Sequence, residues 1–213
     1  MGMVRHAAFV CVRRVSCALA FVVWLLFLAT GCNKVRQTNM SPLDAAGMHP
    51  DSLEQLHEYH VNDSEVQQIL IAGRAGISEQ GCVKLVSIAR SRHRVFAEGD
   101  AVAGLLGAGM KENSVMELVG LDQLNPFAGE AVAMRLAGLS DDVVLDVARH
   151  RAKGEPVLAG ARLAELRDAG YSNAQLVAEL DRGITDKQAD EAIARHNYLV
   201  GGHAFVRQRG RRR

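Results

Sequence analysis

The sequence predicts an all-α fold, built as tandem helical hairpin repeats after an N-terminal leader. Three observations lead to this expectation. Apolar residues recur at helical spacing, and no segment shows the alternation of apolar and polar residues that is typical of a strand. A short motif that ends one helix and begins the next occurs several times. A larger unit is also repeated. The chain has 213 residues, 48% of them hydrophobic and 23% charged. This composition excludes a disordered acidic chain, a collagenous repeat and a disulfide-stapled mini-protein.

The first 31 residues have the parts of a secretory signal peptide. Arg5, Arg13 and Arg14 precede residues 15–29, which contain no charged side chain. A basic segment, an apolar segment and small residues before a cleavage point are the features that direct export. We therefore expect residues 1–31 to be a signal peptide and the mature chain to begin at Cys32.

The end of this leader reads Leu28-Ala29-Thr30-Gly31-Cys32. It resembles the lipobox of bacterial lipoproteins, in which small residues precede a cysteine that receives a diacylglycerol before cleavage. The resemblance implies that Cys32 is lipidated, then N-acylated, and that the protein is anchored in a bacterial cell membrane or outer membrane, facing the periplasm. Ala29 departs from the usual pattern, which has Leu three residues before the cysteine.

Two further points concern the leader. Asn33 follows the cysteine, which by resemblance to enterobacterial lipoproteins implies delivery to the outer membrane. The alternative to a cleaved leader is an uncleaved N-terminal membrane helix, although the apolar run falls short of the roughly 20 residues needed to span a bilayer.

Charge is distributed unevenly along the mature chain. Residues 32–52 are polar without helical period and are expected to be a lipid anchor and flexible tether. The leader contains three arginines and no acids, so its removal changes the formal charge from +1 to −2. Residues 200–213 are expected to be a basic disordered tail, whose last seven residues include Arg207, Arg209, Arg211, Arg212 and Arg213.

This arginine tail suggests binding to anionic lipid headgroups or another polyanion at a membrane surface, worth about 1 kcal/mol per charge. A solvated tail without a ligand is the alternative. Nucleic acid is not an expected partner, because the chain is predicted to be exported and its scattered aromatic residues form no stacking platform.

The returning motif is a glycine, an apolar residue, Ser or Thr, and a polar residue. Its copies are Gly76-Ile77-Ser78-Glu79, Gly138-Leu139-Ser140-Asp141, Gly170-Tyr171-Ser172-Asn173 and Gly183-Ile184-Thr185-Asp186, with a degenerate copy at Gly109-Met110-Lys111-Glu112. Glycine ends a helix in the left-handed conformation, and Ser or Thr caps the next one. We call each copy a helix joint. Ser172 with Gln175 and Thr185 with Gln188 have the spacing of capping boxes.

The larger repeat appears when the two halves are aligned. The segment from Ala75 matches the segment from Ala137, and the residues from Gly99 to Gly109 match those from Gly160 to Gly170. We therefore expect helical unit 1 at residues 53–122 and helical unit 2 at residues 123–199, the latter with a partial third copy from Gly183. The C-terminal ending contains Leu163, Leu166, Gly170, Leu180 and Gly183-Ile184-Thr185. It resembles the short helical hairpins of the oligomerisation modules called SHOCT domains, which implies self-association.

Candidate chemistry is sparse. His57 and His60, with Glu54 nearby, are metal-ligand candidates because their spacing would place them on one helix face. The histidine spacing does not match the zincin pattern, and surface histidines on a solvated helix are the alternative. Cys82 is expected to be a buried core residue, because its neighbours are apolar.

Arginine and histidine also recur together, at Ala148-Arg149-His150, Ala194-Arg195-His196 and Arg92-His93-Arg94. They suggest either a repeated anion-binding edge or cations placed at helix C-termini, where the helix dipole favours them. The glycines between Gly99 and Gly109 have neither a P-loop nor a Rossmann order, so they indicate close helix packing or a bent helix.

The sequence as a whole favours a non-catalytic scaffold or adaptor that binds another envelope protein through its helix faces, with no cofactor. Two alternatives remain open. One is an envelope metalloenzyme or metal-binding protein that uses His57 and His60. The other is a carrier of lipid or another apolar ligand, because stacked helices can enclose a groove.

Overall fold

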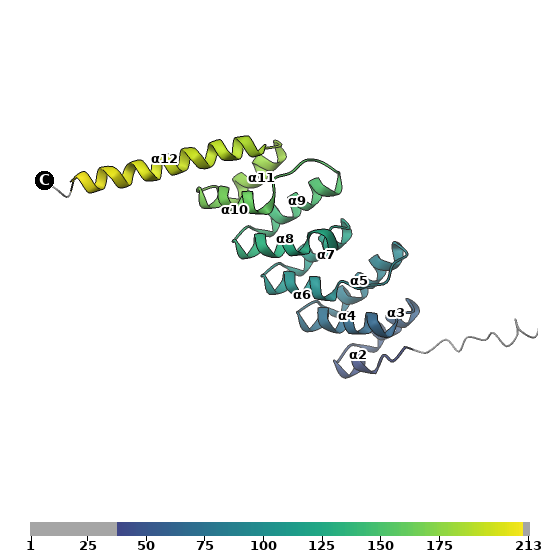
Figure 1. Ribbon diagram of the computed structural model, residues 1–213. Coiled ribbons are helices and arrows are strands. Elements are labelled where there is room, and N and C mark those ends of the chain that lie inside the picture. Colours follow the sequence, from purple (N-terminus) through teal and green to yellow (C-terminus); the bar gives the residue numbers. More distant parts are fainter. Residues whose placement is uncertain (1–37, 211–213) are drawn as a thin grey trace, which may run out of the picture. The chain divides into compact units, whose positions relative to one another are not determined.

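The computed structural model describes residues 38–210, which contain eleven α-helices and no strand, so the predicted all-α class is confirmed (Figure 1). The helices are α2 (Ser41–Ala45), α3 (Pro50–Glu58), α4 (Asp63–Arg74), α5 (Glu79–Ser91), α6 (Gly99–Gly107), α7 (Glu112–Gly120), α8 (Leu124–Leu136), α9 (Asp141–Ala152), α10 (Gly160–Asp168), α11 (Asn173–Asp181) and α12 (Asp186–Gly210). Within these described residues, no helix combines the length and apolar character needed to cross a membrane.

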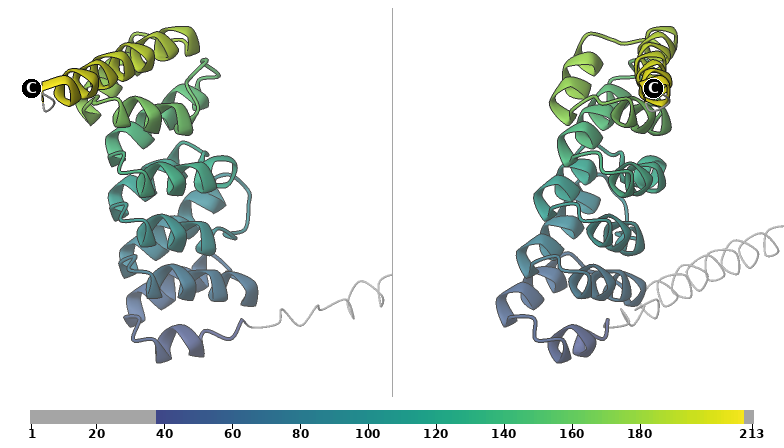
Figure 2. Two further views of the ribbon diagram at one scale, coloured as in Figure 1. Left: turned by 60° about the vertical axis from the view of Figure 1, so that its left-hand side comes forward. Right: turned by 90° about the vertical axis from the view of Figure 1, so that its left-hand side faces the viewer.

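The helices alternate between two layers. The even-numbered helices α2 to α12 pack side by side in chain order, and the odd-numbered helices α3 to α11 do the same in the second layer. The right-hand view of Figure 2 shows the two layers as two columns. Among the described helices, each packs only against its neighbours in the chain and in its own layer. This is the local connectivity of a helical-repeat protein, in which each hairpin is stabilised by the hairpins on either side of it.

The order of the helices repeats with two hairpins per unit. Helices α4, α5, α6 and α7 begin 61 or 62 residues before α8, α9, α10 and α11, respectively. The connections α5 to α6 and α9 to α10 also correspond, since each has seven residues. Helix α12 begins 62 residues after α8, as expected for the start of a third copy.

The five glycine joints adopt the predicted conformation. Their glycines have φ between +72° and +113°, and the apolar residue that follows donates a backbone hydrogen bond to a carbonyl five residues earlier, as Ile77 does to Ala72 at 3.1 Å. His60, His93 and Asp122 have φ of 51°, 55° and 60° and end α3, α5 and α7 in the same way. These three helices therefore end without the glycine that predicted the five joints.

A second set of hydrogen bonds connects these joints along the odd layer. The first residue of each odd helix from α5 to α11 accepts a hydrogen bond from the backbone N–H of the N-cap residue of the preceding odd helix. The pairs are Glu79 with His49 (2.9 Å), Glu112 with Ser78 (3.3 Å), Asp141 with Lys111 (2.9 Å) and Asn173 with Ser140 (3.1 Å). We call this series the joint ladder. It satisfies N-cap donors that point away from their own helices.

The capping predictions at the last two joints are confirmed. Ser172 and Gln175 exchange side-chain and backbone hydrogen bonds, and so do Thr185 and Gln188.

Two expected boundaries are wrong. The tether expected at residues 32–52 contains α2 and the start of α3, because Leu43 is buried to 1% exposure against the core and prolines lie in the first turn of both helices. A helix of five residues is too short to show a period. The tail expected to be disordered from residue 200 continues α12 as far as Gly210, and residues 211–213 lie outside the described part.

Two glycines show how closely the even layer is packed. The backbone N–H of Gly99 donates to Gln68 Oε1 at 2.7 Å, and at the corresponding place in the second unit Gly160 donates to Glu130 Oε1 at 2.6 Å. A Cβ on Gly99 would lie 2.3 Å from the backbone oxygen of Gln68. A Cβ on Gly160 would instead meet the flexible side chain of Met134 at 2.5 Å.

We therefore expect Gly99→Ala to lower the free energy of unfolding by about 1–3 kcal/mol, since the backbones of α4 and α6 must separate. Gly160→Ala should lower the free energy of unfolding by less, because the side chain of Met134 can move away from the added Cβ. Gly129→Ala is the control: its Cβ meets nothing within 4 Å and it should stabilise α8 by about 0.5–1 kcal/mol. Urea unfolding followed by circular dichroism measures all three, and a Gly99→Ala variant as stable as the parent would contradict the packing described.

Candidate functional site

Most of the predicted membrane-binding residues fall outside the described part. Leu28, Ala29, Thr30, Gly31 and Cys32 precede residue 38, so the structure says nothing of the lipobox or the lipidation site. Arg207 and Arg209 belong to helix α12, whereas Arg211, Arg212 and Arg213 lie outside the described residues.

The histidine group predicted from the sequence is not assembled on one helix. His57 lies in the last turn of α3, but the helix ends at Glu58, and His60 follows in the left-handed conformation. The expectation that the two histidines share a helix face is wrong, because it assumed that the helix continues through His60. Glu54, His57 and His60 are all exposed.

The recurring arginine and histidine residues have different roles in different places. Arg149 and His150 occupy the last turn of α9, as expected for cations at a helix C-terminus. Arg195 and His196 lie within α12, which continues to Gly210, so that interpretation is wrong there. The guanidinium of Arg92 donates to the backbone oxygens of Val119 (2.7 Å) and Gly120 (2.6 Å) and thus caps the C-terminus of α7.

A different carboxylate and histidine group is assembled by the fold. Asp146 and His150 lie one turn apart on α9, and Asp181 is the last residue of α11, which packs beside α9. One ligand atom from each residue lies within 4.8 Å of the other two, and His150 Nε2 is 3.8 Å from Asp146 Oδ2. Among the described residues, Asp146, His150 and Asp181 form the one group of three histidine, cysteine or carboxylate side chains close enough to hold a metal ion.

The surroundings of this group are asymmetric. Asp146 is 7% exposed, and its Oδ2 is buried without a hydrogen-bond partner. Burial, together with the charge of Asp181, raises the pKa of Asp146 above its ordinary value. This group was not predicted from the sequence, although an aspartate four residues before a histidine on a predicted helix indicates that the two side chains share a helix face. The contribution of Asp181 depends on the packing of α11 against α9.

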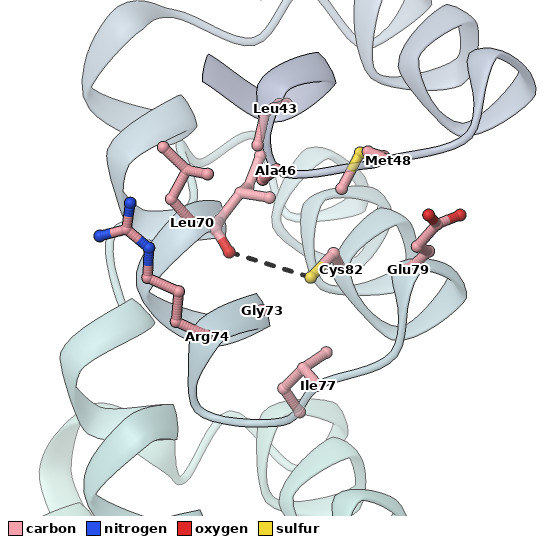
Figure 3. Close-up of a pocket in the computed structure, with 10 residues that line it drawn as sticks. Leu43, Ala46, Met48, Leu70, Gly73, Arg74, Ile77, Glu79 and Cys82 are labelled. Atoms are coloured by element: carbon pink, nitrogen blue, oxygen red, sulfur yellow. Dashed lines mark hydrogen bonds between the residues drawn. The ribbon is translucent and has the colours of Figure 1, made fainter.

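A cavity of about 240 Å³ lies at the other end of the described unit, among α2, α4 and α5 (Figure 3). Its lining includes Leu43, Met48, Leu70 and Cys82. Cys82 is 1% exposed, as predicted, and burial followed by the charges of Glu112 and Glu79 raises the pKa of its thiol to about 11. The thiol is therefore protonated at neutral pH and unsuited to nucleophilic catalysis.

Apart from Asp100, which is exposed in the first turn of α6, the exposed residues of the adjacent helices α6 and α8 are uncharged. Gly104 and Gly107 of α6 and Gly129, Ala133 and Leu136 of α8 are exposed, and Leu136 is 74% exposed. A Cβ added at Gly107 or Gly129 would meet nothing within 4 Å, so these positions are open to an approaching backbone. We call these five residues the α6–α8 face.

The charged residues of α8 are used inside the stack. Glu130 binds Arg151 and the backbone of Gly160, and Arg135 donates to the backbone oxygens of Gly109 and Leu139. Their charges therefore hold neighbouring segments together and leave the exposed side of α8 to small and apolar side chains.

Glu65 is the most deeply buried carboxylate of the described part and has a structural role. It accepts hydrogen bonds from the backbone of Phe96 (2.8 Å) and Asn62 (3.0 Å) and from Arg90 Nη2 (2.7 Å). Burial alone would raise the pKa of Glu65, but these donors outweigh it and hold the pKa below the ordinary value. The carboxylate thus joins α4, α5 and the connection that leads to α6.

No protein-family model, curated protein or solved structure matches the chain. The class of protein is thus defined by the fold itself, a stack of helical hairpins. Such stacks supply extended binding surfaces and carry no chemistry in common, so function depends on what particular residues present on those surfaces.

The Glu65 network predicts a pH-dependent difference in stability. Glu65→Gln should lower the free energy of unfolding at pH 7 by about 2 kcal/mol, because charge-assisted hydrogen bonds are replaced by neutral ones. A carboxylate with a depressed folded-state pKa stabilises the protein above its unfolded pKa and loses this effect as pH falls through the folded one. Urea unfolding should therefore show the difference shrinking towards pH 3. A difference that is constant from pH 7 to pH 3 would contradict the prediction.

Proposed function

We propose that the protein is a lipid-anchored adaptor of the bacterial cell envelope, which holds a partner protein at the membrane surface and has no catalytic role. The proposal combines the lipobox ending at Cys32 with the stacked hairpins of the described residues. The lipid anchor would fix the protein to the inner or outer membrane on its periplasmic side. The hairpins would supply the surface that binds the partner.

The observation that carries the proposal is the α6–α8 face. It is formed by adjacent helices in the middle of the even layer and presents small residues and one exposed leucine. A helix of a partner protein fits such a surface, because glycine and alanine let two backbones approach closely and the five residues of the face are uncharged. Exposed Asp100, one turn before Gly104, lies at the edge of this face.

Two observations favour an adaptor over the alternatives. The cavity among α2, α4 and α5, at about 240 Å³, is smaller than the roughly 300–1,000 Å³ usual for pockets that enclose a small ligand, so a carrier is less well supported. Exposed His57 and His60, on and beyond the end of α3, supply no enclosed site for a metalloenzyme. The arginines from Arg207 onward would add attraction to anionic lipid headgroups.

The first arm of the test concerns the anchor. The full-length chain and its Cys32→Ser variant are expressed in a bacterium with a C-terminal tag, and intact mass and membrane fraction are compared. The native chain should lose residues 1–31, gain the mass of a lipid and sediment with membranes, while the variant does none of these. Retention of the leader in both chains, with equal membrane content, would contradict the proposal.

The second arm concerns the α6–α8 face. A photo-crosslinking residue replaces Ala133 on this face or, as a matched control, exposed Gln80 of α5 on the odd layer. We expect a protein adduct from position 133 only, weakened at least tenfold by Leu136→Asp, and binding of the purified partner with the same sensitivity. Equal adducts from both positions, or none from position 133, would contradict the assignment of this face.

A further inference from the structure

We propose that Asp146, His150 and Asp181 bind a divalent transition-metal ion of the Zn²⁺ class, which joins α9 to α11. This inference does not depend on the lipid anchor or on the α6–α8 face. It concerns the C-terminal hairpins, where no metal ligand was predicted from the sequence.

The geometry suits three protein ligands. Asp146 and His150 are four residues apart, so both project from the same side of α9, and Asp181 reaches them from the end of the neighbouring α11. With metal–ligand bonds of about 2.0–2.2 Å, neighbouring ligands of a tetrahedral zinc ion lie about 3.3–3.5 Å apart. The separation of 3.8 Å between His150 Nε2 and Asp146 Oδ2 requires only a small movement of side chains. A water molecule would complete the coordination.

The second nitrogen of His150 already has the partner that metal-binding histidines usually have. His150 Nδ1 is 2.7 Å from Glu155 Oε2. A proton on Nδ1, donated to this carboxylate, leaves the lone pair of Nε2 on the side that faces Asp146. A carboxylate behind a ligating histidine fixes the orientation of the ring and raises its basicity. Glu155 would therefore orient the ligand without touching the metal.

A buried oxygen without a hydrogen-bond partner is the independent sign that something binds here. Asp146 is 93% buried, and its Oδ2, the atom nearest His150 Nε2, has no hydrogen-bond partner among the described residues. Asp181 brings a second negative charge towards this carboxylate. Arg149 and Lys153 of the same region act on Asp146 only through charge. A divalent cation would satisfy the buried oxygen and neutralise both carboxylates.

The donor set selects the class of metal. One imidazole and two carboxylates suit Zn²⁺ and related transition metals, whereas Mg²⁺ prefers oxygen ligands and retains most of its water. The site should therefore bind Zn²⁺ and show no comparable affinity for Mg²⁺.

The test uses the full chain purified in detergent with a tag that lacks histidine and stripped of metal by a chelator. Isothermal titration with ZnCl₂ should give one ion per chain and raise the melting temperature, while MgCl₂ should do neither. Asp146→Asn and Asp181→Asn should each weaken zinc binding at least tenfold. His57→Gln is the matched control, because it removes an exposed histidine on α3, and it should leave zinc binding unchanged.

Folding of the variants is checked by circular dichroism before titration. Asp146→Asn removes a buried charge, so its metal-free melting temperature should not fall. If this variant does not fold, Asp181→Asn, which changes an exposed residue, decides the outcome. The proposal is overturned if the parent binds no zinc, if both aspartate variants bind it as tightly as the parent, or if His57→Gln is the variant that loses binding.

Discussion

The structure depends on how each hairpin packs against the next, and the helix joints set this packing. At the five glycine joints, a glycine in the left-handed conformation ends one helix, an apolar residue packs against the core, and an N-cap residue begins the next helix. The joint ladder then connects each odd-layer joint to the following one. Three of the four acceptors, Glu79, Glu112 and Asp141, are carboxylates at the first position of a helix. Each of these side chains interacts favourably with the dipole of its own helix and also binds the neighbouring hairpin.

Repetition of this joint explains why the two units are alike in architecture but differ in their surfaces. The joints and the glycines at the starts of α6 and α10 keep the spacing of the layers. Exposed positions contribute little to that spacing and can vary. In the even layer the exposed positions named above are small or apolar on α6 and α8. Between α9 and α11 the group around His150 combines buried Asp146 with exposed Asp181. Both proposals rest on these places.

The fold could be predicted further than the site, because the signals that define it are local. Glycine, an apolar residue and a cap lie within four positions, so joints such as Gly138-Leu139-Ser140 are visible in the sequence. The joints at His60, His93 and Asp122 were missed because a left-handed residue other than glycine has no comparable signal. Helix α2 could not be predicted because it is too short to show a period and is stabilised by packing against α3 and α4, which buries Leu43. Packing between helices also brings Asp181 to His150, so Asp181 could not be assigned to His150, while His57 and His60 were wrongly placed on one helix.

Hydrogen exchange at the N-cap amides tests the joint ladder most directly. N-cap amides have no acceptor within their own helix and usually exchange quickly. In the native protein, the amides of Ser78, Lys111 and Ser140 should be protected, and Asp141→Ala should release protection at Lys111 while leaving Ser78 protected. If Lys111 exchanges in the parent as fast as in an unstructured peptide, or is unaffected by Asp141→Ala, the hairpins are held by core packing alone and the joint ladder has no part in their stability.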